Sequence, residues 1–358
     1  SLLASGQFDV WPVYIAKDGS WYADQAMNDL TFFKRPDFEH DLGTRIKKIR
    51  LLFDQGLTII WPGIRQKTLH VDVVFPAMHG TFGEDGSLMG LLRMAGVPFV
   101  GCDIFASAVS MDKALTKQVL AAEGIPVVPF VWFTKYDWKK DKNAWKEKIT
   151  LLQGPFFVKP VHLGSSIAIS KVKNDTELEN AIGVALHYDD KVLVEESVEN
   201  LVEVTLPIMG NDELQLAAIE KPRSKTGFYD YTDKYLSGGK KGGGVNNEYS
   251  EIPAHIDPEL ARQVEDFGRR TYRVLGCSGI TRVDFLIDGK TKRVYVNEVN
   301  TLPGSLYHHN WRTVGVSGVE LVMKLVALAE ERFKSQQDTV YTFRSNILAK
   351  NMGPKGIE

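Results

Sequence analysis

GITRVDFLIDGKTKRVYVNEVNTLPG, residues 279–304, is the stretch around which the rest of the sequence can be interpreted. It contains two short apolar runs, 282–287 and 293–299, separated by Asp288-Gly289-Lys290. Apolar runs on either side of an Asp-Gly pair predict two antiparallel strands joined by a tight turn. We therefore expect a hairpin here.

Three oxygen-bearing side chains, Asp284, Glu298 and Asn300, fall near one end of the predicted hairpin. Alternation places Asp284 on the same face as Arg282, and Glu298 on the same face as Asn300. A set of oxygen ligands without His or Cys suits Mg²⁺, which takes its other ligands from water and nucleotide phosphates. The alternative is an edge hairpin whose acids are simply solvated. The rigid polar turn that follows, 300–304, favours the metal-site interpretation.

Composition and charge restrict the class of protein. The 358 residues are enough for two or three domains, and 44% apolar with 25% charged residues is typical of a globular protein. A net charge of −2 does not indicate binding to nucleic acid or to an anionic membrane, since both require an excess of positive charge. Since no apolar run is long enough to span a bilayer and the start has no secretory pattern, we expect a cytoplasmic protein. Cys102 and Cys277 are expected to be buried and unpaired.

The first hundred residues alternate apolar strand patterns with helical ones. Strands are predicted over 8–15, 72–75 and 97–100, with a helix over 87–95. This alternation predicts a parallel α/β domain that ends near residue 106. Residues 1–5 look like the end of a helix, so we expect a strand and a loop to precede them.

His79 and Glu84 lie in the glycine-rich loop after the predicted strand 72–75. The loop at the carboxyl end of a parallel strand is the expected ligand position. A lone His is more often structural, so the pair alone decides nothing.

The predicted strand 156–160 ends in Lys159-Pro160 and continues into the small-residue loop Gly164-Ser165-Ser166. An ammonium, backbone N–H groups and hydroxyls in this order can hold phosphate. The spacing is neither that of a Walker loop nor that of a dinucleotide fingerprint. A further strand, 191–196, ends in two acids, and residues 107–198 are expected to form a small α+β domain. Within it, helices are predicted up to Ala122 and over 136–152.

Residues 221–247 have no hydrophobic periodicity, and they place several tyrosines ahead of a glycine–lysine run. Such a segment is either a lid that closes over a ligand or a disordered insertion. Amphipathic helices are predicted over 258–275 and 316–333. We expect a C-terminal domain over 199–335 and an extended tail over 336–358.

Taken together, these pieces resemble the D-alanine–D-alanine ligases of the ATP-grasp superfamily. The motifs that carry the resemblance occur in family order: HGTFGEDGSLMGLL (79–92), GCDIFASAVSMDKALTK (101–117), FFVKPVHLGSSIAISKV (156–172), FYDYTDKYL (228–236) and TRVDF…NEVNTLPG (281–304). The resemblance implies an α/β (α+β) ATP-grasp fold in which an N-terminal α/β domain is followed by two α+β subdomains that clamp ATP.

The resemblance also implies roles for individual residues. The residues implied to bind ATP are Lys113, Lys159, Glu195, Glu196, Glu203 and Lys234. The implied metal ligands are Asp284, Glu298 and Asn300. The residues implied to act in catalysis are Arg282 and the Gly304 backbone at the oxyanion, Ser165 and Tyr235 of the lid contact, and His79 near the substrates.

The activity that the resemblance implies is ATP-dependent joining of two D-alanines through an acyl phosphate, for peptidoglycan synthesis. Mg²⁺ is the expected metal, with Mn²⁺ and a monovalent cation as further candidates, and a homodimer is expected. Ser305 and His308 follow Gly304 where the family pattern differs, so a second substrate such as D-lactate, D-serine or another amine stays open. The family's N-terminal loop, whose glutamate binds the first substrate, has no match. A nucleotide-binding relative without ligase activity is therefore the remaining alternative.

Overall fold

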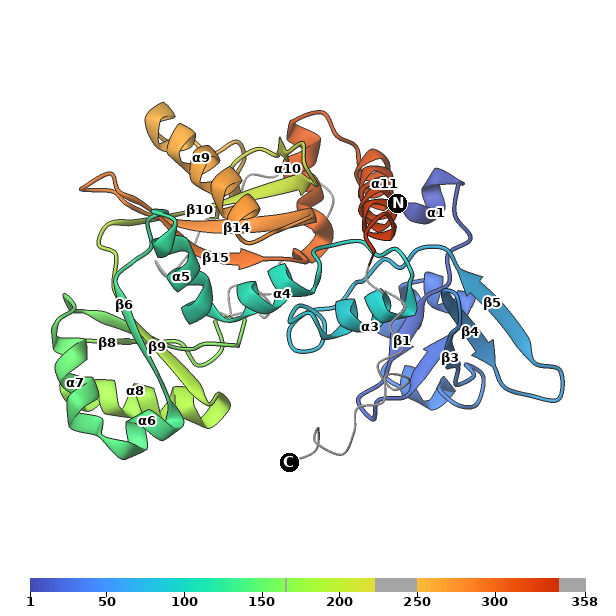
Figure 1. Cartoon of the computed structure of the whole chain (residues 1–358), viewed down its shortest axis with the longest axis horizontal. Coiled ribbons are helices and arrows are strands. Elements are labelled where there is room, and N and C mark those ends of the chain that lie inside the picture. Colours follow the sequence, from blue (N-terminus) through green and yellow to red (C-terminus); the bar gives the residue numbers. More distant parts are fainter. Residues whose placement is uncertain (165, 223–249, 341–358) are drawn as a thin grey trace, which may run out of the picture.

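The computed structural model describes residues 1–164, 166–222 and 250–340 (Figure 1). The described chain is a mixed α/β structure that contains two four-stranded antiparallel sheets, one in the middle of the sequence and one towards its C-terminal end. Figure 1 shows helix α5 (Lys113–Ala122) between these two sheets and helix α4 (Ile104–Met111) beside it, on the side of the N-terminal part.

The N-terminal part contains short antiparallel strands in place of a regular parallel sheet. Its strands are β1 (Val13–Ile15) paired with β2 (Trp21–Ala23), and β3 (Arg50–Phe53), β4 (Leu57–Trp61) and β5 (Lys67–Val71) in the order β3-β4-β5. The predicted strand 8–15 was too long, because Pro12 lacks the N–H that a ladder requires. The expected parallel pairing of 72–75 with 97–100 is reduced to one bridge between Val74 and Phe99.

Short helices complete this part: α1 (Leu2–Ser5), η1 (Gln25–Asn28), α2 (Thr31–Lys34), η2 (Phe38–Asp41) and α3 (Ser87–Ala95). The last of these confirms the predicted helix 87–95, which begins after Gly86 in the left-handed region (φ 89°). Met89 and Leu92 of α3 are buried against Phe99 and the end of β5. The loop that carries His79 therefore leads into a firmly packed helix.

The central sheet has the strand order β6-β9-β7-β8. Its strands are β6 (Phe130–Thr134), β7 (Phe156–Pro160), β8 (Ser170–Val172) and β9 (Lys191–Glu196), and its helices are α6 (Lys135–Lys140), α7 (Lys142–Thr150) and α8 (Asp175–Tyr188). The predicted helix 136–152 was wrong in being continuous. Asp141 ends α6 and its side chain accepts a hydrogen bond from the Ala144 amide (3.0 Å), so it starts α7 as an N-cap. The sequence reasoning did not anticipate α8.

The two faces of the central sheet differ in chemistry because side chains alternate along each strand. Val158 and Val194 point into the apolar core beneath α8. Lys159 and Glu195, one residue further along, point to the opposite face, which meets α5. The alternation thus directs a buried charged pair towards the middle of the molecule.

The second sheet has the order β11-β10-β14-β15. Its strands are β10 (Leu201–Gly210), β11 (Gln215–Leu216), β14 (Gly279–Asp288) and β15 (Val294–Asn300), and the small sheet β12 (Lys221–Pro222) with β13 (Ser250–Glu251) lies beside it. The predicted hairpin is confirmed as β14 and β15. One face is covered by α9 (Pro258–Val274), where Val264 packs with Val283 and Phe285.

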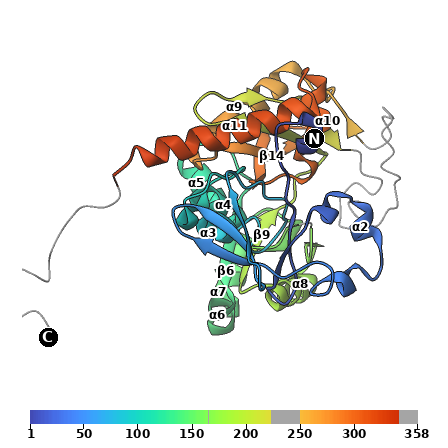
Figure 2. The ribbon, with the colours of Figure 1, turned by 90° about the vertical axis from the view of Figure 1, so that its right-hand side faces the viewer.

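The chain then forms η4 (Gly304–Tyr307), α10 (His308–Thr313) and α11 (Gly318–Gln337). Figure 2 shows the C-terminal end of α11 projecting from the rest of the chain. The predicted tail 336–358 overlaps the end of this helix, and its later residues lie outside the described part. None of the described helices combines the length and apolar composition needed to span a membrane. Cys102 and Cys277 are buried and free, as expected.

Candidate active site

The hairpin β14–β15 brings the predicted metal ligands together by means of a β-bulge. Asp284 is opposite Glu298, and Arg282 is opposite Asn300. The register then shifts by one residue, so that Phe285 pairs with Val296 and Asn297 is the extra residue. A bulge of this kind reverses the facing of the side chains beyond it. Glu298 and Asn300 consequently share a face with Asp284, although Val294 and Val296 of the same strand are buried in the core.

Arg282 is held in place by its neighbours on this face. Its guanidinium donates two hydrogen bonds to Asp284, at 2.6 Å from Nε and 2.5 Å from the terminal nitrogen, and a third to the Tyr307 hydroxyl at 2.8 Å. Burial disfavours the charge, but the Asp284 carboxylate raises the pKa of Arg282 above its ordinary value. Asn300 also donates to Asp284, at 3.2 Å. The result is a cation fixed beside a cluster of oxygen donors.

Lys113 connects α5 with this cluster. Its ammonium lies 4.0 Å from the Glu298 carboxylate and donates a 2.7 Å hydrogen bond to the carbonyl of Leu163, in the loop after β7. Burial lowers the pKa of Lys113, and Glu298 opposes that effect. The contact places the phosphate-type loop of the central sheet next to the acids of the second sheet. Sequence separation between these elements exceeds a hundred residues.

Glu195 forms a buried ionic triad with Lys159 and Lys117. Its carboxylate accepts a hydrogen bond from the Lys159 ammonium and lies 3.0 Å from the Lys117 ammonium. The side chains of Glu195 and Lys117 are each only 1% exposed. Burial alone would raise the pKa of Glu195, but the two lysines lower it to about 2. The sequence reasoning missed Lys117. Its spacing of four residues from Lys113 puts both lysines on one face of α5, a pattern that could have identified it.

His79 approaches the same region from the N-terminal part. A side chain at Gly304 would lie 3.6 Å from the His79 ring, so the ring is adjacent to this backbone. Nδ1 of His79 is 3.9 Å from the Glu84 carboxylate, and Glu84 raises the pKa of His79. The Glu84 carboxylate also accepts a 2.6 Å hydrogen bond from the Gly80 amide, which joins the two ends of the loop after His79. His79, Gly304 and the Arg282 cluster thus lie together.

The turn after Gly304 has an unusual backbone. Ser305, Leu306 and Tyr307 all have positive φ, between 50° and 54°. Each such residue outside glycine costs about 1–2 kcal/mol, so the surrounding contacts must hold the turn. One such contact is the bond between Tyr307 and Arg282, and burial raises the pKa of that tyrosine.

His308 and His309 differ in their surroundings. His308 is exposed and its Nδ1 is only 3.3 Å from the Ser305 carbonyl, within the turn itself. His309, which like His308 was a candidate from the sequence for contact with the second substrate, lies 3.2 Å from the buried Glu220. Glu220 is paired with Thr205, itself opposite Asp284, so His309 is close to the metal-type cluster.

The structure does not bring every predicted residue to this cluster. Glu203 shares the face of Asp284 but is opposite Leu286, two pairs further along β10 and β14. Glu196 points away from the face of Glu195 and accepts a hydrogen bond from the Gln153 amide at 2.8 Å. Ser165, Lys234 and Tyr235 lie outside the described residues. The predicted lid, 221–247, also lies outside them except for its first two residues.

The arrangement is suited to binding a polyanion beside a divalent cation. Lys113 of α5 approaches the hairpin from the central sheet, where Lys159 lies, and Arg282 lies among the oxygen donors of the hairpin itself. Two carboxylates and an amide oxygen are the donors that Mg²⁺ prefers, and nucleotide phosphates normally complete its coordination. This is the chemistry required for phosphoryl transfer.

Comparisons with known proteins identify one family. A family model described as D-ala D-ala ligase C-terminus matches residues 119–327, and one described as D-ala D-ala ligase N-terminus matches residues 1–102. A D-alanine–D-alanine ligase from Thermosipho africanus is 35% identical over 348 residues, which are 97% of this chain and 91% of the relative.

Solved structures give the same result. The VanG D-Ala:D-Ser ligase from Enterococcus faecalis is 32% identical with a TM-score of 0.75, and covers 91% of each chain. The D-alanine–D-alanine ligase from Coxiella burnetii is 28% identical with a TM-score of 0.73, and the match covers 91% of this chain and 85% of that one. The ATP-grasp fold expected from the sequence is therefore confirmed, and the chain belongs to the D-alanine–D-alanine ligase family.

Proposed function

We propose that this protein joins two D-alanines into D-alanyl-D-alanine for cell-wall synthesis, with ATP as the source of activation. Membership of the ligase family supports the reaction. The observation that carries the assignment to these residues is the meeting of Lys113 with Glu298 at 4.0 Å, because it joins a phosphate-type loop to a set of metal-type oxygens.

The reaction needs activation because a carboxylate does not react with an amine in water. In the proposed first step, a carboxylate oxygen of one D-alanine attacks the γ-phosphorus of ATP, the bond to the bridging oxygen breaks, and ADP leaves. Several negative charges meet in this step, so positioning and electrostatics supply most of the catalysis. Lys113 and Lys159 are the cations proposed to bind the phosphates. The ion pair with Glu195 holds Lys159 at the buried face of β7.

The residues of the hairpin fit a divalent cation. Asp284 and Glu298 provide carboxylates on one face, and each carboxylate can accept more bonds than Arg282 and Asn300 use. We propose Asp284, Glu298 and Asn300 as the ligands of Mg²⁺. When bound, the ion would neutralise negative charge on the phosphates of ATP.

In the second step, the amine of the other D-alanine attacks the carbonyl carbon of the acyl phosphate, and inorganic phosphate leaves. An oxyanion develops on the former carbonyl oxygen. Arg282 is fixed by Asp284 and Tyr307, so a remaining guanidinium N–H can be aimed at that oxygen without reorganisation. The Gly304 backbone N–H is the proposed second donor, with His79 adjacent to it.

The direct test is phosphate release from ATP in the presence of D-alanine, with mass spectrometry of the product. We expect release that requires D-alanine and a product with the mass of the dipeptide. Parallel reactions with D-serine and D-lactate as second substrates test the open specificity. Absence of any release dependent on an amino acid would contradict the ligase assignment, and a clear preference for D-serine or D-lactate would replace the proposed product.

The metal assignment is tested separately with Asp284→Asn and Glu298→Gln. Both changes remove a negative charge at nearly constant volume, so turnover should fall about 100-fold or more, with a higher Mg²⁺ requirement. Asp266→Asn on the exposed face of α9 is the matched control, and its turnover should stay normal. Near-normal turnover and Mg²⁺ dependence in both site variants would refute the assignment.

A further inference from the structure

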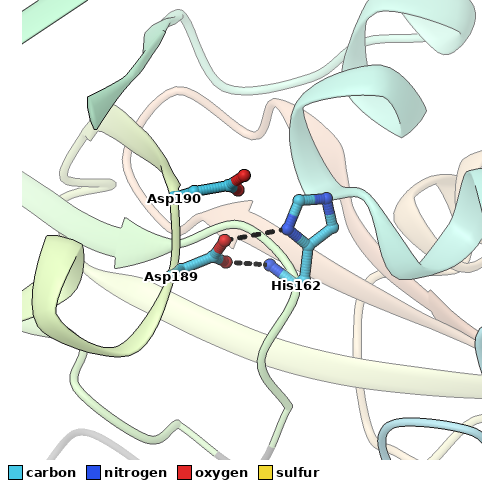
Figure 3. Close-up of side chains that lie close together, drawn as sticks. All are labelled: His162, Asp189 and Asp190. Carbon is cyan, nitrogen blue, oxygen red and sulfur yellow. Dashed lines mark hydrogen bonds and ion pairs between the residues drawn. The ribbon is translucent and has the colours of Figure 1, made fainter. Parts of the chain in front are cut away.

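His162 lies two residues after the end of β7 and has no part in the site described so far. Its ring and its backbone amide nevertheless contact two carboxylates. Its Nδ1 lies 2.9 Å from one oxygen of Asp189, and its backbone amide donates to the other oxygen at 2.7 Å. Figure 3 shows the Asp189 carboxylate facing both groups, with Asp190 beside the ring. Asp189 ends α8 and precedes β9, so this pair joins two strands of the central sheet at their ends.

The other ring nitrogen of His162 faces a second carboxylate. Nε2 lies 3.4 Å from Asp112, which also accepts from Lys191 at 2.7 Å and from the Leu115 amide at 2.8 Å. Asp112 is the N-cap of α5 and immediately precedes Lys113. Since carboxylates only accept hydrogen bonds, a ring bonded to both must carry both protons. The imidazolium thus bridges α5 and the end of α8.

Backbone bonds connect this bridge with the proposed phosphate-binding groups. The amide of Val161 donates to the carbonyl of Lys191 (3.1 Å), and the amide of Lys113 donates to the carbonyl of Val161 (3.4 Å). The Lys113 ammonium then bonds the Leu163 carbonyl, directly after His162. The start of α5, the end of β7 and the loop towards Ser166 are therefore fixed to one another around His162.

The charges around the ring favour its protonated form. Asp112 and Asp189 bond it, Asp190 and Lys191 lie at the same turn, and Asp85 lines the same cavity of about 330 Å³ from the N-terminal side. Because Asp112 and Asp189 accept hydrogen bonds from the protonated ring, they raise the pKa of His162 to about 9. Because the pKa is raised, the ring is fully protonated and the bridge complete at a pH below the ordinary pKa of histidine. The bridge is lost as the pH rises through about 9.

The arrangement of His162, Asp189 and Asp190 also brings their ligand-type atoms within 4.8 Å of one another. However, Nδ1 of His162 donates its proton to Asp189, and a ring nitrogen must be unprotonated to bind a metal. The pattern is that of a hydrogen-bonded ion pair, and the ring protons serve the role that a cation would have.

We propose that His162, as an imidazolium between Asp112 and Asp189, is a positioning residue that fixes Lys113 and the loop after β7 around the phosphates of ATP. The inference rests on the proposed ATP site but concerns affinity rather than chemistry, because His162 touches no reacting group. Loss of the bridge should therefore weaken ATP binding more than it slows turnover at saturating ATP.

The test measures the Kd of Mg-ATP at pH 7 and pH 10 for the wild type, His162→Ala and His162→Arg. Loss of one charge-assisted bridge predicts about tenfold weaker binding by His162→Ala at pH 7. The wild type should approach that variant at pH 10. Arginine donates to two carboxylates and does not titrate, so His162→Arg should lose less affinity than the wild type between pH 7 and pH 10. Effects of pH on other groups of the site are common to all variants, so the comparison with His162→Arg isolates the ring.

His187→Ala, at the exposed end of α8, is the matched control and should keep the wild-type Kd at both pH values. An unchanged Kd in folded His162→Ala overturns the proposal, as does equal weakening in His187→Ala. If His162→Ala does not fold, Asp189→Asn should weaken binding and lower the pH at which affinity falls, and a wild-type profile would overturn the idea. Wild-type protein that binds ATP without D-alanine-dependent phosphate release would refute the proposed function alone, and protein that binds no ATP would refute both.

Discussion

Glu195 is a buried carboxylate that forms ion pairs with two lysines, Lys117 and Lys159, at the face between the central sheet and α5. Breaking a buried ion pair by removing one partner typically costs about 3–5 kcal/mol, because the other charge is left in a low-dielectric interior. We expect Glu195→Gln to lower the free energy of unfolding by about that amount. Urea unfolding followed by circular dichroism measures it.

The pH dependence follows from the direction of the pKa shift. The pKa of Glu195 is lowered to about 2 in the folded chain, so its contribution is complete above the ordinary carboxyl value and is lost as the pH falls towards 2. The stability difference between the wild type and Glu195→Gln should shrink over this range. Glu196→Gln is the control, since its neutral amide oxygen can still accept from Gln153. An equal loss in both variants would argue against the buried triad.

Among the elements, the hairpin β14–β15 depends on how the extra residue Asn297 is accommodated. If Asn297 paired in a regular ladder, the alternation of β15 would continue from Val294 and Val296 and would turn Glu298 and Asn300 towards the core. Deletion of Asn297 would leave Phe285–Val296 and Asp284–Glu298 as consecutive pairs of a regular ladder, so Glu298 and Asn300 should keep their facing. We therefore expect this deletion to keep turnover and the Mg²⁺ requirement near the wild-type values.

Asn297→Ala separates the length of the strand from the chemistry of this side chain. The backbone bulge is retained in that variant, so phosphate release and the melting temperature should stay close to wild type. A deletion variant whose turnover falls about 100-fold or more would show that the bulge itself, and not only the pairing of Glu298 with Asp284, is needed for the proposed metal site. Mg²⁺ titrations of both variants distinguish loss of metal affinity from loss of fold.

Across the whole molecule, Arg332 of α11 connects distant segments. Its guanidinium donates to the carbonyls of Phe99 (2.7 Å) and Gly101, and to the Ser278 hydroxyl (2.6 Å). It thereby fastens the segment before α4 to the loop before β14. Arg332→Met would leave two carbonyls without this donor, at about 1–3 kcal/mol each, so we expect a clear fall in the melting temperature.

Lys334→Met is the matched control for that variant, because it removes a cation from the exposed side of the same helix. Its melting temperature should change little. Equal melting temperatures for the two variants would mean that Arg332 contributes nothing beyond its charge on α11. Scanning fluorimetry without ligands measures both, and ATP should be omitted since its binding would stabilise the folded state.

Short-range features of the sequence predicted much of the fold and the site. The hairpin, helix α9 and the helix of 87–95 follow from apolar periodicity and turn residues within one segment. The ordered motifs predicted the family and the cluster of Arg282 with Asp284. The strands of 50–71 and helix α8 were not anticipated, because their apolar patterns are short and their partners lie outside the local window. The domain boundaries, the homodimer and the cytoplasmic location stay predictions.

The sequence by itself determined that an oxygen-rich hairpin and a lysine strand are present, since residue types and their spacing suffice for that. Tertiary structure alone decided that Asn297 turns Glu298 to the site, that Lys117 shares Glu195 with Lys159, and that His162 lies between two carboxylates. These outcomes depend on strand register and on desolvation of charges whose partners are distant in the chain. Register and desolvation are set by packing, and no local pattern of residues encodes them.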